Sequence, residues 1–104
     1  MAWISLSLAG LLEVVWAYYM KQSHGFTRLG PSIITLVAMI ASFALLSFSM
    51  RSLPLGTAYT IWTGIGAVGA FLLGLMVLGE PANALRIIAA FLIVSGLVLM
   101  KMAS

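Results

Sequence analysis

The amino-acid sequence predicts an all-α membrane protein with four transmembrane helices in each subunit. Of the 104 residues, 63% are hydrophobic and only 7% are charged, whereas about a quarter of the residues in a soluble domain are charged. The apolar residues fall into four segments of roughly 19–22 residues, each long enough to cross a hydrocarbon core of about 30 Å. In lipid each segment must be helical, because every backbone polar group needs a partner within the protein.

The expected helices span, in chain order, residues 2–20, 32–50, 57–78 and 84–102. Together they form a single transmembrane domain over residues 1–104, with short connectors and no soluble part. The first segment contains an acid and has no basic stretch before it, so we interpret it as a retained helix and not as a signal peptide. Pro31 suits the first turn of the second helix, Gly79 the end of the third, and Asn83 the N-cap of the fourth.

The composition also limits the chemistry that the chain can perform. There are no cysteines, one histidine and two acidic residues, so we expect neither a metal site nor a cofactor. Five basic residues, dispersed along the chain, are too few to form a nucleic-acid-binding surface.

The basic residues hardly specify which way the chain inserts into the membrane. Lys21, Arg28 and Arg86 lie on the side of the first and third connectors, whereas Arg51 and Lys101 lie on the other side. The orientation follows the side that has more Lys and Arg, and three against two is almost no bias. One interpretation is that both orientations occur and assemble together, in which case a two-fold axis in the membrane plane would relate the subunits.

The first helix carries Glu13, the only acid inside an expected span. An ionised acid at this depth costs about 2.5–3.5 kcal/mol on insertion scales, so such residues usually face a protein interior and have a function. A structural glutamate that is protonated or hydrogen-bonded is the alternative. Gly10 and Trp16 share its helix face at a spacing of three residues. Trp16 offers a π face and one N–H donor, although it could instead belong to an interfacial aromatic belt.

The second helix carries Ser42 near the middle of its span, at a depth where it could meet Glu13 or Trp16. A serine in a membrane helix often bonds only the carbonyl four residues before it, so both interpretations stay open.

The third helix places Tyr59 and Trp62 on one face, together with Gly66. Aromatic faces attract cations, and a tyrosine hydroxyl can donate to a carboxylate. Gly64 and Gly66 could form a hinge in this helix, or they could simply permit close helix packing.

The fourth helix has no polar group suited to a substrate. Its Ala89 and Gly96 are seven residues apart and therefore share a face, which indicates a packing seam between subunits. A dimer would bring two Glu13 carboxylates together as a coupled pair. Such a pair, framed by tryptophan and tyrosine, suits a small organic cation and protons that compete for the same oxygens.

Several stretches of the chain match a known family. They are "GLLEVVWA", "HGFTRLGPS", "LPLGTAYTIWTGIGAVG" and the seam in the fourth helix. On these stretches the chain resembles the small multidrug resistance family along its whole length. The resemblance implies an antiparallel homodimer of four-helix subunits in the bacterial inner membrane. It also implies a proton-coupled exporter and not an enzyme, in which Glu13 binds protons or substrate and the glycine-rich third helix bends during alternating access.

Within this family, Trp16 and the run "GTAYTIWTGIGAVG" resemble the guanidinium-exporter subtype, whereas the multidrug subtype usually has glycine at the position of Trp16. The resemblance implies a site around Glu13 that is lined by Gly10, Trp16, Ser42, Tyr59 and Trp62. In it, Ser42 and Trp16 would orient the glutamates, and Tyr59 would hydrogen-bond one of them.

Tyr18 and Tyr19 depart from the smaller or aliphatic residues expected at their positions, which affects the expected substrate range. The alternative function is therefore efflux of quaternary ammonium biocides and other multidrug cations. Met39 and Phe43 would then form a portal between subunits that admits an alkyl tail. Two other classes also remain, a rotor-ring subunit, which buries one carboxylate beside glycines, and a passive channel.

Overall fold

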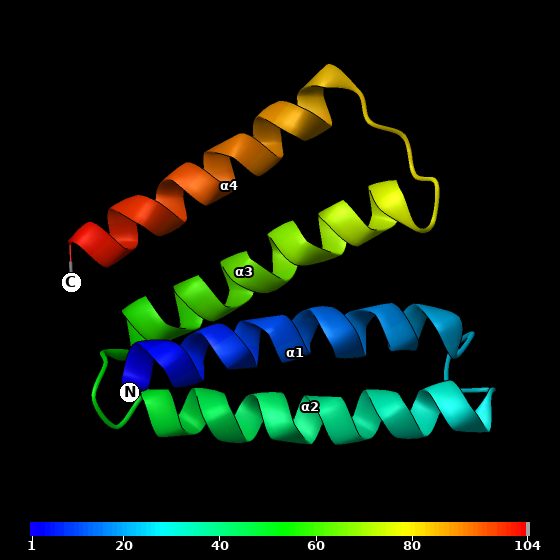
Figure 1. The fold of residues 1–104 in the computed structure, drawn as a ribbon, viewed down its shortest axis with the longest axis horizontal. Helices are drawn as coiled ribbons and strands as arrows, with labels where there is room; N and C mark the ends of the chain where they lie inside the picture. Colours follow the sequence, from blue (N-terminus) through cyan, green and yellow to red (C-terminus); the bar gives the residue numbers. More distant parts are fainter. Residues whose placement is uncertain (104) are drawn as a thin grey trace.

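The computed structural model describes residues 1–103, and it confirms the expected all-helical chain (Figure 1). Its helices are α1 (Ala2–Gln22), α2 (Leu29–Ser49), α3 (Leu55–Met76) and α4 (Ala84–Met102). All four are long and apolar enough to cross a membrane.

The observed helix ends differ from the expected ones by a few residues. The second helix begins at Leu29 and not at residue 32. Backbone N–H groups in the first turn of a helix have no partner within the helix, so Pro31, which lacks an N–H, fits inside that turn. The third helix ends at Met76, and the chain then reverses through Gly79, whose φ of +68° lies in the left-handed region that favours glycine. The Asn83 side chain accepts the Arg86 backbone N–H at 3.0 Å, so the predicted N-cap of α4 is confirmed.

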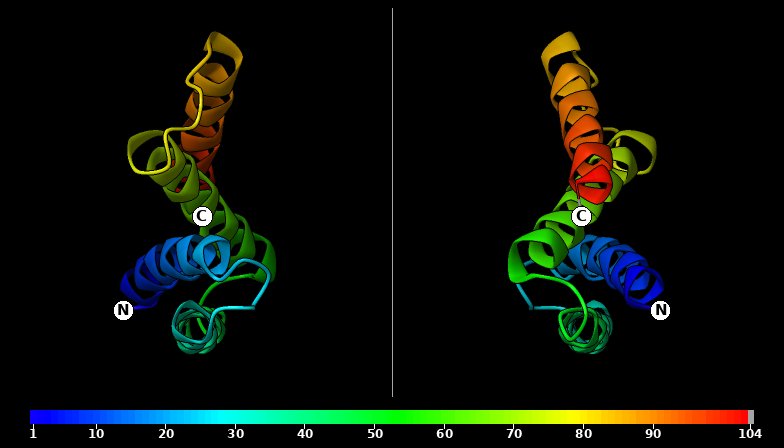
Figure 2. Two further views of the ribbon diagram at one scale, coloured as in Figure 1. Left: turned by 90° about the vertical axis from the view of Figure 1, so that its right-hand side faces the viewer. Right: turned by 90° about the vertical axis from the view of Figure 1, so that its left-hand side faces the viewer.

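The helices form one thin layer and not a closed bundle. In Figure 1, α1 lies beside α2 and beneath α3, and α4 follows α3 on the outer side. Figure 2 shows the same layer edge-on, with α4 extending away from the other helices. The principal extents are 40 × 34 × 16 Å, so the shortest dimension is less than two helix diameters of about 10–12 Å each.

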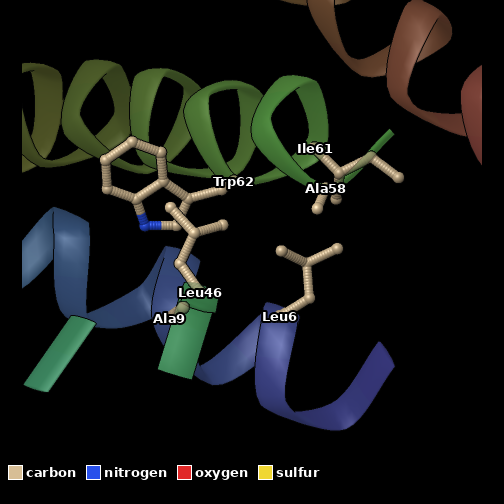
Figure 3. Close-up of a cluster of buried hydrophobic side chains, with 6 residues drawn as sticks. All are labelled: Leu6, Ala9, Leu46, Ala58, Ile61 and Trp62. Carbon is tan, nitrogen blue, oxygen red and sulfur yellow. The ribbon is translucent and has the colours of Figure 1, made fainter. Parts of the chain in front are cut away.

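The buried core is small and lies where α1, α2 and α3 meet (Figure 3). Its buried members are Leu6, Ala9, Leu46, Ala58, Ile61 and Trp62. In the described chain α4 contributes no buried residue, and side chains such as Leu85 and Phe91 are 79% and 73% exposed. One subunit therefore presents broad apolar surfaces that only lipid or another subunit can cover.

Candidate functional site

Glu13 projects from the middle of α1 toward α3. A methyl group at Gly66 would overlap the Glu13 carboxylate, and a methyl group at Gly10 would overlap the Ile65 side chain. These two glycines therefore let α1 and α3 approach closely at the depth of the acid. As a result the Glu13 side chain lies between two helices.

Two buried polar atoms on this face of α1 lack a hydrogen-bond partner among residues 1–103. They are Oε1 of Glu13, an acceptor, and Nε1 of Trp16, a donor. Buried polar atoms are nearly always hydrogen-bonded in folded proteins, and leaving one unpaired costs about 1–3 kcal/mol. One face of α1 thus presents a buried acceptor and a buried donor, neither of which has a partner among the described residues.

A row of aromatic rings leads away from Glu13 across α1, α2 and α3. The Trp16 and Phe43 rings have centroids 6.4 Å apart, and the Phe43 and Trp62 rings 5.6 Å apart, both edge-to-face. Tyr59 continues the row with its ring centroid 5.6 Å from that of Trp62. Edge-to-face pairs hold rings in fixed orientations, so the row is an ordered aromatic wall next to the acid.

Ser42 anchors this wall. Its hydroxyl donates to the Ala9 carbonyl of α1 at 2.7 Å and accepts the Trp62 indole N–H of α3 at 2.9 Å. The side chain is fully buried. Neither partner is the carbonyl four residues before Ser42. The hydroxyl therefore links α2 to α1 and α3 and makes no hydrogen bond within α2.

The expected contacts to Glu13 are absent within one subunit. In the part of the chain that the structure describes, no hydrogen bond links Glu13 to Ser42, Trp16 or Tyr59. Tyr59 is 53% exposed, so its hydroxyl remains accessible to a second subunit. It therefore stays a prediction for the dimer that the glutamates are oriented by Ser42, Trp16 and Tyr59.

The glycines of α3 serve packing in this conformation. The helix is continuous from Leu55 to Met76. Gly66 faces Glu13, and a methyl group at Gly64 would overlap Leu97 of α4. Bending at Gly64 and Gly66 stays a prediction.

The remaining candidates lie toward the outside of the subunit. Met39 is half-buried and Phe43 is 47% exposed, which leaves part of α2 open beside the aromatic row. On α4, Ala89 and Gly96 are both exposed, and a methyl group at Gly96 would meet nothing within 4 Å. The expected dimer seam is thus free of contacts inside the subunit.

Sequence reasoning missed two features of this region. It treated Phe43 only as a portal residue, although its ring also bridges Trp16 and Trp62; the sequence of α2 holds no signal for these contacts, because they depend on how the helices pack. It also did not pair Glu80 with Arg86, although the two side chains form an ion pair.

Comparison with known proteins places these residues in a family context. The family model described as Small Multidrug Resistance protein matches residues 1–93. The chain is 61% identical over 104 residues to the guanidinium exporter of Yersinia pestis, covering all of both chains. It is 58% identical to that of Salmonella typhimurium and 57% identical to that of Escherichia coli K12, in each case over all of this chain and 99% of the relative.

Proposed function

The chain belongs to the small multidrug resistance family, and on this premise we propose that it exports guanidinium and small guanidinyl cations in exchange for protons. It is a multi-pass protein of the bacterial inner membrane. The relatives that match its full length are named guanidinium exporters, which supports guanidinium as the substrate class.

One observation carries the proposal, the unpartnered carboxylate oxygen of Glu13 beside the unpartnered indole N–H of Trp16. A carboxylate in apolar surroundings needs either a proton or a cation. Guanidinium is planar and has N–H donors on every side, so it can bridge carboxylate oxygens as an arginine side chain does. The ring faces of Trp16 and Trp62 add attraction for a cation.

Exchange follows from competition for Glu13. A proton on the carboxylate removes the charge that holds guanidinium, and bound guanidinium likewise excludes the proton. If the site changes sides only when it holds a proton or guanidinium, and not when it is empty, an outward movement of guanidinium is coupled to an inward movement of protons. This coupling requires that the site face one side of the membrane at a time, as in alternating access.

The site requires a second subunit. A single subunit is one helix layer thick and leaves the aromatic row open, with Tyr59 and Phe43 half exposed. In an antiparallel homodimer a second layer covers this face and contributes a second Glu13. The nearly balanced basic residues support insertion in both orientations.

Replacement of Glu13 by Gln tests the mechanism. In proteoliposomes with a pH gradient, wild-type protein should drive uphill guanidinium uptake, whereas Glu13→Gln should lose both uptake and guanidinium-dependent proton movement. Glu13→Asp, which retains the acid, should keep measurable exchange and serves as the matched control. Full guanidinium exchange by Glu13→Gln would exclude this carboxylate as the shared site.

Efflux of quaternary ammonium cations is the second candidate, favoured by the exposure of Phe43 and the neighbouring Met39. An alkyl tail could pass between these flexible side chains. Electrical recording on supported membranes with guanidinium, alkylguanidines and quaternary ammonium compounds ranks the substrates. Stronger currents for quaternary ammonium compounds than for guanidinium would favour the second candidate.

A further inference from the structure

A cavity of about 330 Å³ lies between the C-terminal halves of α1 and α3 and the α3–α4 connector. Its lining includes Tyr18 and Lys21 at the end of α1, as well as Phe71, Glu80 and Arg86. Tyr18 is thus a wall of this cavity, where its ring also packs edge-to-face on Tyr19 with centroids 5.2 Å apart. The cavity is separate from the aromatic row of the central site.

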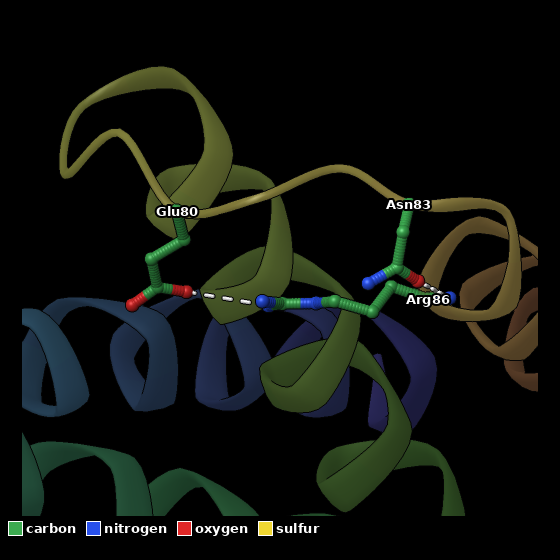
Figure 4. A network of polar contacts seen from close by, with 3 residues as sticks. All are labelled: Glu80, Asn83 and Arg86. Carbon is green, nitrogen blue, oxygen red and sulfur yellow. Dashed lines mark hydrogen bonds and ion pairs between the residues drawn. The ribbon is translucent and has the colours of Figure 1, made fainter.

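Inside this cavity the protein holds a guanidinium group of its own. The Arg86 Nη2 atom lies 3.3 Å from Oε1 of Glu80, as Figure 4 shows. The Arg86 Cζ atom lies 5.2 Å from the centroid of the Phe71 ring. A carboxylate and an aromatic face are the two partners that a planar cation uses best. We call this pair the Glu80–Phe71 cradle.

Both members of the cradle are held by α3, Phe71 as part of the helix and Glu80 through contacts with Gly74. The Glu80 backbone N–H donates to the Gly74 carbonyl at 2.9 Å. A methyl group at Gly74 would overlap the Glu80 carboxylate, so the absence of a side chain there lets the carboxylate lie against α3. Phe71 belongs to the same helix, whereas Arg86 comes from α4, where the Asn83 cap holds its backbone.

The ion pair of Arg86 with Glu80 is partly open to solvent. The side chains of Arg86 and Glu80 are 34% and 40% exposed, and ion pairs in contact with water are weak. A dissolved guanidinium ion can therefore compete with the side chain for the same carboxylate. The cavity also reaches Val14 and Ala67, the chain neighbours of Glu13 and Gly66, so it extends from the cradle toward the central site.

We propose that the Glu80–Phe71 cradle is a second binding site for guanidinium cations, in which Arg86 is the resident ligand that an arriving or leaving substrate displaces. The identity of the ligand rests on the proposed function, whereas the site itself rests on the geometry of Glu80, Phe71 and Arg86.

Binding of ¹³C-guanidinium to the full chain in detergent or nanodiscs tests the site. Every protein in this experiment carries Glu13→Gln, which disables the central carboxylate, and the protein with this change alone is the parent. Adding Arg86→Gln vacates the cradle and should tighten guanidinium binding roughly two- to fivefold, the range that loss of an exposed ion-pair competitor allows. Further addition of Glu80→Gln should abolish saturable binding. Arg86→Lys keeps a competing charge and should bind guanidinium as weakly as the parent.

Arg51 supplies a matched control. Its guanidinium also lies over a phenylalanine, with Cζ 5.8 Å from the centroid of the Phe48 ring, but no ion pair is found for it in the described chain. Arg51→Gln should therefore leave guanidinium binding unchanged. Tetramethylammonium at equal ionic strength should bind the vacated cradle more weakly than guanidinium, because it keeps the charge and the contact with the Phe71 ring but has no N–H donor for the carboxylate.

The outcomes separate the two proposals. If the Arg86→Gln protein, with helix content unchanged by circular dichroism, binds guanidinium no better than the parent, or binds equally with Glu80→Gln, the second site is excluded. Neither result bears on transport through Glu13. Conversely, failure of wild-type protein to transport guanidinium would exclude the proposed function, even if the vacated cradle bound the ion.

Discussion

At the scale of single residues, Ser42 shows how one hydroxyl can hold a site together. It is fully buried and connects the Ala9 carbonyl to the indole N–H of Trp62. The Trp62 ring in turn packs against the rings of Phe43 and Tyr59. The orientation of the aromatic wall therefore depends on a residue that does not contact Glu13 in the subunit.

Ser42→Ala should destabilise the protein by about 1–3 kcal/mol, because it leaves the buried Trp62 donor without an acceptor. Unfolding by SDS titration in mild detergent measures this loss. Ser95→Ala is the control, since the Ser95 hydroxyl is exposed and bonds the Phe91 carbonyl of its own helix at 2.8 Å; it should change stability by no more than about 0.5 kcal/mol. Equal losses for both variants would contradict the linking role of Ser42.

The candidate site was predictable from sequence as a set of residues but not as a set of contacts. Glu13 is conspicuous because an acid is costly inside an apolar run, and Trp16 follows from helical spacing. The partner of Ser42 could not be derived in this way, since helical periodicity gives the face of a residue within its own helix. It does not give the register between α1, α2 and α3, which fixes the contact with the Ala9 carbonyl.

At the scale of helices, the glycines of α3 determine how closely this helix packs on its neighbours. Gly66 admits the Glu13 carboxylate, and Gly69 admits the Val14 side chain. The apolar run made the existence of α3 predictable. Which glycine receives which side chain depends on how α3 crosses α1, and the sequence pattern does not contain that angle.

Gly66→Ala should impair transport without unfolding the protein. Its methyl group would displace the Glu13 carboxylate, and misplacing a reacting group by about 1 Å can cost up to roughly a hundredfold in rate. We expect guanidinium uptake to fall roughly tenfold or more while helix content is retained. Gly56→Ala, on the same helix and with nothing within 4 Å of the added methyl group, should transport normally, and similar losses in both variants would contradict the specific role of Gly66.

The outer helix α4 should determine assembly. Gly96 has open space around it in the subunit, so Gly96→Leu should leave the fold of one subunit intact but obstruct the seam shared with Ala89. We expect the dimer fraction, counted by single-molecule photobleaching in liposomes, to fall several-fold. Val98 is 54% exposed and lies about half a turn away on α4. Val98→Leu should therefore dimerise normally, and an undiminished dimer fraction for Gly96→Leu would place the seam elsewhere.

At the scale of the whole molecule, the small thickness of the subunit and the nearly equal numbers of basic residues on its two sides both support an antiparallel dimer. The subunit is only 16 Å thick and leaves Tyr59 and Phe43, in the aromatic row beside Glu13, half exposed; the proposed transport site therefore needs a second layer. Three basic residues on one side against two on the other leave orientation almost undetermined. An antiparallel pair satisfies both conditions, because each orientation supplies one layer.

Fixing the orientation should therefore abolish transport, and mixing two fixed orientations should restore it. Arg51→Gln with Lys101→Gln leaves basic residues only beside the first and third connectors. Lys21→Gln and Arg28→Gln with Ser52→Lys shifts the excess to the opposite side. By the charge rule for insertion each variant should adopt one orientation, which a C-terminal reporter can verify. Cells that express either variant alone should fail to grow on toxic guanidinium, and cells that express both should grow. Growth with either variant alone, despite a single verified orientation, would show that parallel subunits suffice and would contradict the antiparallel dimer.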